Sequence, residues 1–386
     1  MPVWPKSILQ FGANLLTART AVRLRSRGRA TRLQQSAFRG LVRHLASTSY
    51  WREAGIAAGM SYEQFRRQVA PRAHAALAPA IARMQQGEAG VLWPGRCAFF
   101  ALTAGTSTGQ PRVIPVTPPM LRHFRDAGQE ALLFYTAQSG HAGVFRGRHL
   151  VLAGSDTLQE IATGGHRAFV GQWPAVAALT RSRWVRADGY EPRPDIAALA
   201  DWREKLEAVV ATVATSDISL LAGMPPWVLA AAAALLSAQA AAGHPLDNLQ
   251  ALWPNLECYV HGGTPLGPYQ PELRAALGPT VNFHEVYAAA EAIIAAQDTP
   301  VPGALRLIAG RGVFFEFVPL AAFDERRVEA AGERALPLAD VQPGVDYVVL
   351  VTTPAGLARY VLGDIVRFTS VEPPRLTYTG RVGEQL

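Results

Sequence analysis

From residue 91 onwards the chain alternates between short apolar segments with a strand pattern and longer segments with a helical pattern. Helical segments near 201–214, 227–242 and 270–277 lie between strand-like segments at 97–104, 112–117, 150–155, 257–263 and 281–287. Strands that alternate with helices favour a parallel sheet covered by helices. After about residue 300, short strand-like segments follow one another directly, which is typical of an antiparallel or barrel-like part. The pattern predicts an α/β fold of layered helices and sheet with a β-rich, barrel-like C-terminal third.

The first 90 residues have a helical pattern instead. Apolar residues recur at helical spacing between Phe38 and Leu45, and Ser61 with Gln64 three residues later has the form of a capping box. The chain has 386 residues, whereas one hydrophobic core usually stops growing near ~250–300 residues. We therefore expect a helical segment at 1–90, an αβ core at 91–300 and a β-rich part at 301–386.

Composition and charge exclude several classes of protein. Hydrophobic residues make up 49% of the chain and charged residues 17%, which excludes a disordered chain, and two cysteines exclude a disulfide-stapled scaffold. The net charge of +7 comes almost entirely from arginine. Arginines that precede the first acidic residue, Glu53, are Arg19, Arg23, Arg25, Arg27, Arg29, Arg32, Arg39 and Arg43. They indicate one of two things: a basic arm that binds nucleic acid or an anionic membrane, or a helix face exposed to solvent. We favour the solvated face because few aromatic residues are available to stack on bases.

Two apolar segments have some features of targeting or membrane signals. The N-terminal segment MPVWPKSILQFGANLL lacks an uninterrupted apolar core that ends at a small-residue cleavage site. The alanine-rich stretch after Pro225 and Pro226 is shorter than the ~20 residues of a membrane span. We expect a cytoplasmic protein without a membrane partner.

The densest chemistry lies in the segment TAGTSTGQPR, residues 103–112. Two glycines allow the backbone to approach an anion, four hydroxyls can donate to phosphate oxygens, and an arginine can neutralise charge. The segment does not match GxxxxGK[ST], which excludes an ordinary P-loop. It predicts a phosphate-binding loop whose candidate residues are Thr103, Gly105, Thr106, Ser107, Thr108, Gly109 and Arg112.

The same segment also contains the G-x-S-x-G pattern of serine hydrolases, centred on Ser107. In those enzymes the serine lies on a turn from a strand straight into a helix. Here Pro111 and a strand-like segment follow, and no histidine occurs after His284 to act as a late triad base. A serine hydrolase and a plain turn without a ligand are therefore the less favoured alternatives.

The segment TAGTSTGQPRVIP resembles the ATP loop of adenylate-forming enzymes. Its closest variant is that of the auxin-responsive Gretchen Hagen family of acyl acid–amido synthetases, in particular the bacterial members. The resemblance extends in the same order through DWREKLEAV, LWPNLECYVHGGTPLGPYQPEL, NFHEVYAAAEA, VFFEFVPL and TTPAGLARYVLGDIVRFTS, from about residue 35 to 385. It implies the large domain of an adenylate-forming ligase. Such an enzyme activates a carboxylic acid with ATP and Mg²⁺ as an acyl-adenylate and then joins it to an amine or amino acid.

The resemblance also implies roles for residues outside the loop. Gly262 and Gly263 would line the adenine, and Tyr287 would stack on it. Glu291 would ligate Mg²⁺, which prefers oxygen ligands, and would act in catalysis together with Arg112 of the loop.

The ribose roles fall near the C-terminal end of the resemblance. Asp364 would hold the ribose hydroxyls, and Arg381 would assist there, just before the hinge of the family. Catalysis would come mainly from positioning and charge neutralisation, so no side chain needs to become covalent.

Two features depart from the family. Ala288 and Ala290 replace polar residues beside Glu291, and a lost charge-assisted hydrogen bond, worth ~1.5–3 kcal/mol, would weaken activity tenfold or more. The family also continues into a small lid domain that supplies a lysine, whereas Lys6 and Lys205 lie outside the matching motifs. We expect this lid to be missing or supplied by a separate partner protein. The alternative hypothesis is a lidless, catalytically weak module that binds nucleotide or acyl-adenylate.

Overall fold

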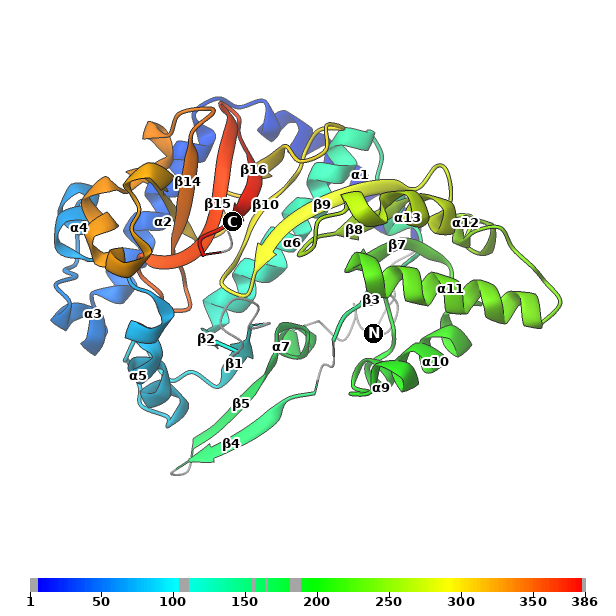
Figure 1. Ribbon diagram of the computed structural model, residues 1–386, viewed down its shortest axis with the longest axis horizontal. Coiled ribbons are helices and arrows are strands. Elements are labelled where there is room, and N and C mark those ends of the chain that lie inside the picture. Colours follow the sequence, from blue (N-terminus) through cyan, green and yellow to red (C-terminus); the bar gives the residue numbers. More distant parts are fainter. Residues whose placement is uncertain (1–5, 104–110, 155–156, 164–165, 181–188, 384–386) are drawn as a thin grey trace.

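The computed structural model describes residues 6–103, 111–154, 157–163, 166–180 and 189–383 (Figure 1). The helices that precede the first strand are α1 (Lys6–Leu24), α2 (Arg29–Leu45), α3 (Ser49–Glu53), α4 (Tyr62–Gln68) and α5 (His74–Gln85). In α2 the residues Phe38, Leu41, Val42 and Leu45 are buried, as their spacing predicts. The predicted capping box is confirmed at α4, where Ser61 Oγ accepts from Gln64 N at 3.2 Å and Gln64 Oε1 accepts from Ser61 N at 2.9 Å.

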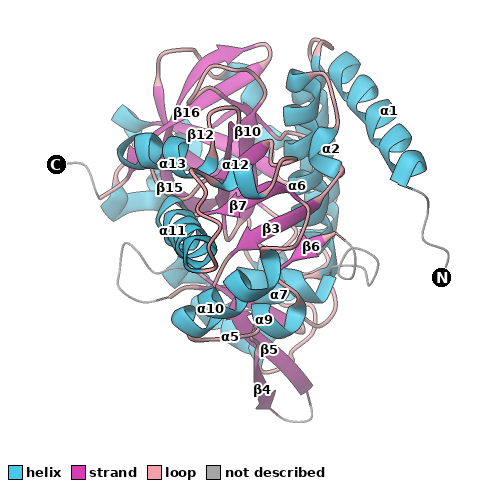
Figure 2. Ribbon diagram, turned by 90° about the vertical axis from the view of Figure 1, so that its right-hand side faces the viewer, coloured by secondary structure: helices cyan, strands magenta, loops and turns pink. Residues whose placement is uncertain are grey.

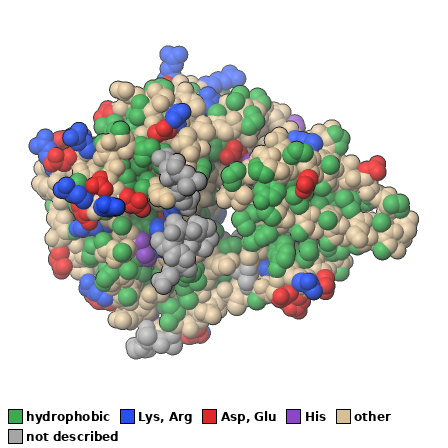
Figure 3. Space-filling view, viewed as in Figure 1, with side chains coloured by type: hydrophobic (Ala, Val, Ile, Leu, Met, Phe, Trp, Pro, Cys, Tyr) green, Lys and Arg blue, Asp and Glu red, His purple; other side chains and the backbone are tan. Residues whose placement is uncertain are grey.

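The central part of the chain forms a parallel sheet. Its strands are β3 (Arg148–Leu152), β6 (Tyr190–Glu191), β7 (Ile218–Gly223), β8 (Cys258–His261) and β9 (Asn282–Ala289), in the spatial order β6-β3-β7-β8-β9. Helices α9 (Pro194–Ala197), α10 (Trp202–Val213), α11 (Pro225–Ala241), α12 (Leu249–Leu252) and α13 (Gln270–Leu277) belong to this part. Figure 3 shows apolar side chains gathered over α11, whose outer face is mostly alanine.

Both faces of the parallel strands are covered. Leu221 packs into a core with Val228 of α11, whereas its neighbour Leu220 packs with Tyr135 of the long helix α6 (Pro118–Ser139) on the other face. This burial on two sides is the usual condition for parallel strands. Figure 2 shows α1 beside α6, and Thr17 Oγ1 donates to Thr136 Oγ1 at 3.0 Å between them.

The C-terminal third is antiparallel. Its strands are β10 (Ala292–Gln297), β11 (Leu305–Leu307), β12 (Phe314–Pro319), β13 (Leu336–Pro337), β14 (Asp346–Thr352), β15 (Tyr360–Val371) and β16 (Pro374–Arg381). The order β13-β12-β14-β15-β16-β11-β10-β9 joins them to the parallel strands, so one sheet of 12 strands runs through the molecule. The predicted α/β class is confirmed. The β-rich part extends this sheet and does not close into a separate barrel.

A smaller sheet carries the loop at 103–112. Its order is β2-β1-β5-β4, with β1 (Phe99–Leu102), β2 (Val113–Val116), β4 (Gln159–Thr163) and β5 (His166–Gln172), followed by α7 (Trp173–Thr180). Strand β1 is antiparallel to β2 and parallel to β5.

The early arginines lie on α1, on α2 and in the connection between them, and most of their side chains are exposed. Among the helices in the described ranges, none is both long enough and apolar enough to cross a membrane.

Candidate functional site

The β1–β2 hairpin closes the base of the loop. Thr103 N donates to Arg112 O at 2.9 Å, and Arg112 N donates to Thr103 Oγ1 at 3.0 Å, directly beyond the paired residues Leu102 and Val113. Residues 104–110, which include Gly105, Thr106, Ser107, Thr108 and Gly109, lie outside the described residues. The two described members of the predicted loop, Thr103 and Arg112, are thus held side by side at its base.

The surroundings of this hairpin differ from a nucleophile elbow. The segment after the loop is strand β2, whereas an elbow needs a helix there. His284 is buried, its Nε2 contacts Ala131 O at 3.0 Å, and burial lowers its pKa to about 4. Because His284 points into α6 and the helix is missing, this geometry gives no support to the hydrolase alternative.

Tyr287, Asp364 and Arg381 meet although they come from three strands. Tyr287 Oη on β9 donates to Asp364 Oδ2 on β15 at 2.6 Å, and Arg381 Nη1 on β16 donates to Asp364 Oδ1 at 3.2 Å. Asp364 is 5% exposed and is paired with Arg381 in the sheet register. Tyr287 also forms an edge contact with Tyr378, with ring centroids 5.7 Å apart. The structure therefore brings together three residues that the sequence assigned to the nucleoside.

Glu291 lies beside this group, in the tight turn between β9 and β10. Its side chain is buried, and burial raises its pKa; the Tyr360 hydroxyl and the Arg112 guanidinium lower the pKa, and the Asp364 carboxylate raises it further. Tyr360, the first residue of β15, lies near both Glu291 and Arg112, although its buried hydroxyl forms no hydrogen bond within the described part of the chain; burial together with Glu291 raises its pKa. Glu291 thus lies close enough to both Arg112 and Asp364 for each of them to shift its pKa. We call Thr103, Arg112, Tyr287, Glu291, Tyr360, Asp364 and Arg381 the polar cluster.

The two predicted glycines follow β8, next to the strand that carries Tyr287. A Cβ at Gly262 would lie 2.1 Å from Val286 O, so only glycine allows the end of β8 to approach β9 this closely. Gly263 has φ +75°, a conformation that favours glycine, with open space where a side chain would be. Both glycines therefore have a backbone reason to be glycine, and Gly263 leaves room beside β9.

Three further residues lie near Arg112 and Glu291 that the sequence did not indicate as site residues: Arg72, His74 and Tyr360. Arg72 pairs with Tyr360 in an isolated parallel bridge, and the rings of His74 and Tyr360 lie 6.3 Å apart. Burial and the nearby Arg112 lower the pKa of His74. Within the described part of the chain, His74 Nδ1 and Arg72 Nε are buried without a hydrogen bond. Of these three residues, only Tyr360 could have been suspected from the sequence, because it lies four residues before Asp364 in the same strand-like segment.

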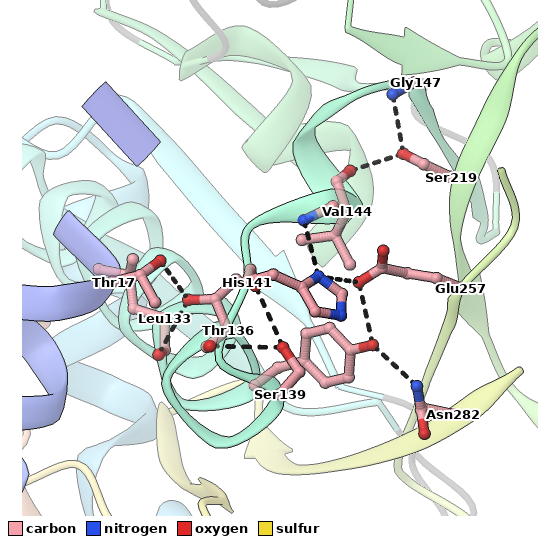
Figure 4. A network of polar contacts seen from close by, with 12 residues as sticks. Thr17, Leu133, Thr136, Ser139, His141, Val144, Gly147, Ser219, Glu257 and Asn282 are labelled. Atoms are coloured by element: carbon pink, nitrogen blue, oxygen red, sulfur yellow. Dashed lines mark hydrogen bonds and ion pairs between the residues drawn. The ribbon is translucent and has the colours of Figure 1, made fainter. Parts of the chain in front are cut away.

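A second polar network lies where β8 and β9 begin (Figure 4). Tyr135 Oη donates to Glu257 Oε1 at 3.0 Å and accepts from Asn282 Nδ2 at 3.1 Å, while His141 Nδ1 lies 3.7 Å from Glu257. Burial raises the pKa of Glu257. Glu257 precedes β8 and Asn282 begins β9, whereas the polar cluster lies at the carboxyl end of β9, where open α/β sheets bind ligands. We therefore assign the Glu257 network a structural role: it fastens α6 to the sheet.

Two family models match the chain: the GH3 family N-terminal domain over residues 24–167 and the GH3 family central domain over residues 306–381. Together they cover more than half of the chain. A probable indole-3-acetic acid-amido synthetase, GH3.12 of Oryza sativa subsp. japonica, is 26% identical and aligns with 91% of this chain and 69% of its own length. A probable indole-3-acetic acid-amido synthetase of Arabidopsis thaliana, GH3.1, is 32% identical over 31% of this chain and 19% of its own length.

Solved structures agree on the fold. The GH3.15 acyl acid amido synthetase superposes with a TM-score of 0.72 at 17% identity, over 99% of this chain and 72% of that one. An open 2-hydroxyisobutyryl-CoA ligase, in complex with 2-HIB-AMP and CoA, gives a TM-score of 0.56 at 14% identity, over 92% of this chain and 75% of that one. The chain thus shares the layered αβ fold of an acyl acid amido synthetase and of an acyl-CoA ligase.

Proposed function

The chain belongs to the GH3 family, and we propose that it uses ATP to adenylate a carboxylic acid and then transfers the acyl group to an amine or amino acid. The observation that carries the proposal is the polar cluster. Arg112 from the β1–β2 hairpin, Glu291 from the β9–β10 turn and Asp364 from β15 are brought together from distant segments. They lie near the carboxyl end of β9, and they are the residues to which the motif order assigned the phosphate, the metal and the ribose.

The reaction has two displacements. A carboxylate oxygen of the acid attacks the α-phosphorus of ATP, and the bond to pyrophosphate breaks. The amine nitrogen then attacks the acyl carbon, the bond to the phosphate oxygen breaks, and AMP and a proton leave. Neither step needs a nucleophile from the protein, so the side chains act by orientation and charge.

Within this proposal each part of the polar cluster has a distinct task. The Asp364 carboxylate accepts from the ribose hydroxyls, held in place by its bonds to Tyr287 and Arg381. Arg112 neutralises phosphate charge next to the loop. The ring of Tyr287 and the open space at Gly263 border the adenine. The substrates are a small carboxylic acid and an amine or amino acid.

Glu291 fits Mg²⁺ as an oxygen ligand. It is buried beside a second carboxylate, Asp364, which raises its pKa, so a cation there would relieve the repulsion between the two groups. Within the described ranges there is no cluster of three or more metal-ligating side chains. One carboxylate with the remaining positions filled by phosphate oxygens and water is a usual arrangement for Mg²⁺. A bound Mg²⁺ would supply charge neutralisation on the phosphates.

Replacing Glu291 by glutamine should remove most of the effect of Mg²⁺ on ATP binding. The amide keeps the size of the side chain but loses the charge, so we expect Mg·ATP to bind roughly tenfold more weakly, the effect of one lost charge-assisted contact. Titration calorimetry with ATP, in Mg²⁺ or in EDTA, measures this. Glu285→Gln is the matched control, because Glu285 lies on the same strand outside the polar cluster. If the ATP affinity of Glu291→Gln depends on Mg²⁺ as strongly as that of wild type, Glu291 is not the Mg²⁺ ligand.

The function itself is tested by calorimetry with Mg·ATP, followed by pyrophosphate release with a panel of carboxylic acids. We expect one ATP site per chain and release that depends on the acid. A second candidate function, a nucleotide-binding module with weak catalysis, is favoured by Ala290, which offers no hydroxyl beside Glu291. ATP binding without pyrophosphate release for every acid would support the module. Absence of ATP binding would contradict both candidates.

A further inference from the structure

A separate cavity lies between helix α2, the segment 58–62, strand β12 and the segment 337–339. Its volume is about 530 Å³. That volume falls within the range of sites for small molecules. None of the residues of the polar cluster lines it.

The floor of the cavity is aromatic. The ring centroids of Phe38 and Phe314 lie 5.1 Å apart, those of Phe38 and Tyr62 5.8 Å, and those of Tyr62 and Phe314 5.6 Å, with both Tyr62 pairs edge to face. Phe38 and Phe314 are 5% and 3% exposed, so an aryl group can add one further ring contact at the parts of these rings that the cavity leaves open.

The floor is also held in place. The Gln34 amide donates to Ala309 O at 2.8 Å and to Val313 O at 2.9 Å, and it accepts from Phe315 N at 2.8 Å. These three bonds fix α2 against β12 and the segment just before it. The aromatic floor therefore belongs to the rigid core, which reduces the entropy cost of binding a ring there.

The rim of the cavity is positive. Arg39 and Arg43 lie one turn apart on α2, both exposed, and neither forms an ion pair or side-chain hydrogen bond among the described residues. The lining contains no Asp or Glu. Two guanidinium groups above an apolar floor, without a neutralising acid, are complementary to a carboxylate attached to a ring.

We propose that this cavity is a second ligand site that binds a small aryl carboxylate. The ring lies on Phe38, Tyr62 and Phe314, and the carboxylate lies between Arg39 and Arg43. The proposal stands on this cavity alone and is independent of the reaction at the polar cluster.

Photolabelling with 4-benzoylbenzoate, an aryl carboxylate with a photoreactive ketone, tests the proposal. After irradiation of the full chain, peptide mass spectrometry should place the label on Met60 or on the peptide 31–43, which carries the α2 residues of the lining. The double variant Arg39→Gln/Arg43→Gln should lose roughly tenfold in labelling there, the effect of a lost charge-assisted contact. The neutral analogue 4-benzoylbenzamide should label these peptides weakly.

The matched control is Arg29→Gln/Arg32→Gln, which removes the same charge from α2 outside the cavity lining and should keep the labelling. Equal thermal midpoints of the two double variants would confirm that both fold. Four results would each overturn the proposal: no label at these peptides, equal labelling in both double variants, equal labelling by the amide, or a label confined to the polar cluster. The last result would mean that the acid binds only as a substrate.

Discussion

Replacing Arg359 by methionine should destabilise the protein by about 3–5 kcal/mol, the usual cost of removing one partner of a buried ion pair. Arg359 is 0% exposed and Glu316 is 1% exposed. The guanidinium meets both carboxylate oxygens, at 3.0 and 3.1 Å. Methionine fills much of the same volume but leaves the Glu316 charge in the core with Tyr62 Oη, 3.0 Å away, as its remaining side-chain donor.

The same guanidinium also satisfies three backbone carbonyls. It donates to Arg66 O at 2.9 Å, Val69 O at 2.6 Å and Gly332 O at 2.7 Å, so Arg359 joins the end of α4 to the C-terminal third. Loss of these donors adds to the cost, because buried carbonyls without partners are themselves unfavourable. Urea unfolding followed by circular dichroism, with the midpoint and slope compared to wild type, measures the change in the free energy of unfolding.

Two controls separate burial from charge. Arg367→Met removes an arginine that pairs with Asp346 at the surface and should cost below about 1 kcal/mol. The double variant Arg359→Met/Glu316→Met should be more stable than Arg359→Met alone, because no unpaired charge remains. If Arg359→Met costs no more than Arg367→Met, the buried pair does not stabilise the fold.

Much of the order of helices and strands could be predicted because their patterns are local. The Ser61–Gln64 capping box and the buried face of α2 follow from spacing alone. Helix α6 was missed although its signal was present: Thr117 caps the helix, Pro118 and Pro119 occupy its first turn, and apolar residues recur behind them.

The region around Glu291 shows where local reasoning fails. The segment AAAEA has high helix propensity, yet residues 288 and 289 end β9 and Glu291 lies in a turn to β10. Pairing of β9 with β8 on one side and β10 on the other overrides that propensity. The parallel and antiparallel parts meet at β9, which pairs with β8 on one side and with β10 on the other. The sequence shows a change of pattern near residue 300, but it does not show that the two parts form one sheet.

The polar cluster was predicted through motif order, and its contacts could not be derived from periodicity. Tyr287 and Asp364 are 77 residues apart, and three strands, β16, β11 and β10, separate β15 from β9 in the sheet order, so only the tertiary packing brings the two side chains within 2.6 Å. Arg72 and His74 were missed for the same reason: their proximity to Tyr360 depends on one isolated bridge. Long-range contacts of this kind are set by packing, which leaves no local pattern.

Replacing Asp364 by alanine should weaken ATP binding at least tenfold. A carboxylate that accepts from the ribose hydroxyls contributes about 1.5–3 kcal/mol per charge-assisted bond, and about 1.4 kcal/mol corresponds to a factor of ten in affinity. Calorimetry with Mg·ATP measures the loss. Asp346→Ala is the matched control, because Asp346 pairs with Arg367 on the exterior of the neighbouring strand β14 and should leave ATP affinity unchanged.

Because Asp364 also holds Tyr287 and Arg381, a weaker affinity alone does not separate ribose binding from a disturbed site. A nucleotide without the ribose hydroxyls, 2′,3′-dideoxy-ATP, separates the two. If Asp364 binds those hydroxyls, wild type should prefer ATP about tenfold over the dideoxy analogue, and Asp364→Ala should lose that preference, since both changes remove the same contact. Asp364→Asn keeps the shape of the side chain and one acceptor, so its preference for ATP should lie between those of wild type and Asp364→Ala. An equal preference for ATP in wild type and in Asp364→Ala would assign Asp364 to the structure of the cluster and would leave the ribose to another group.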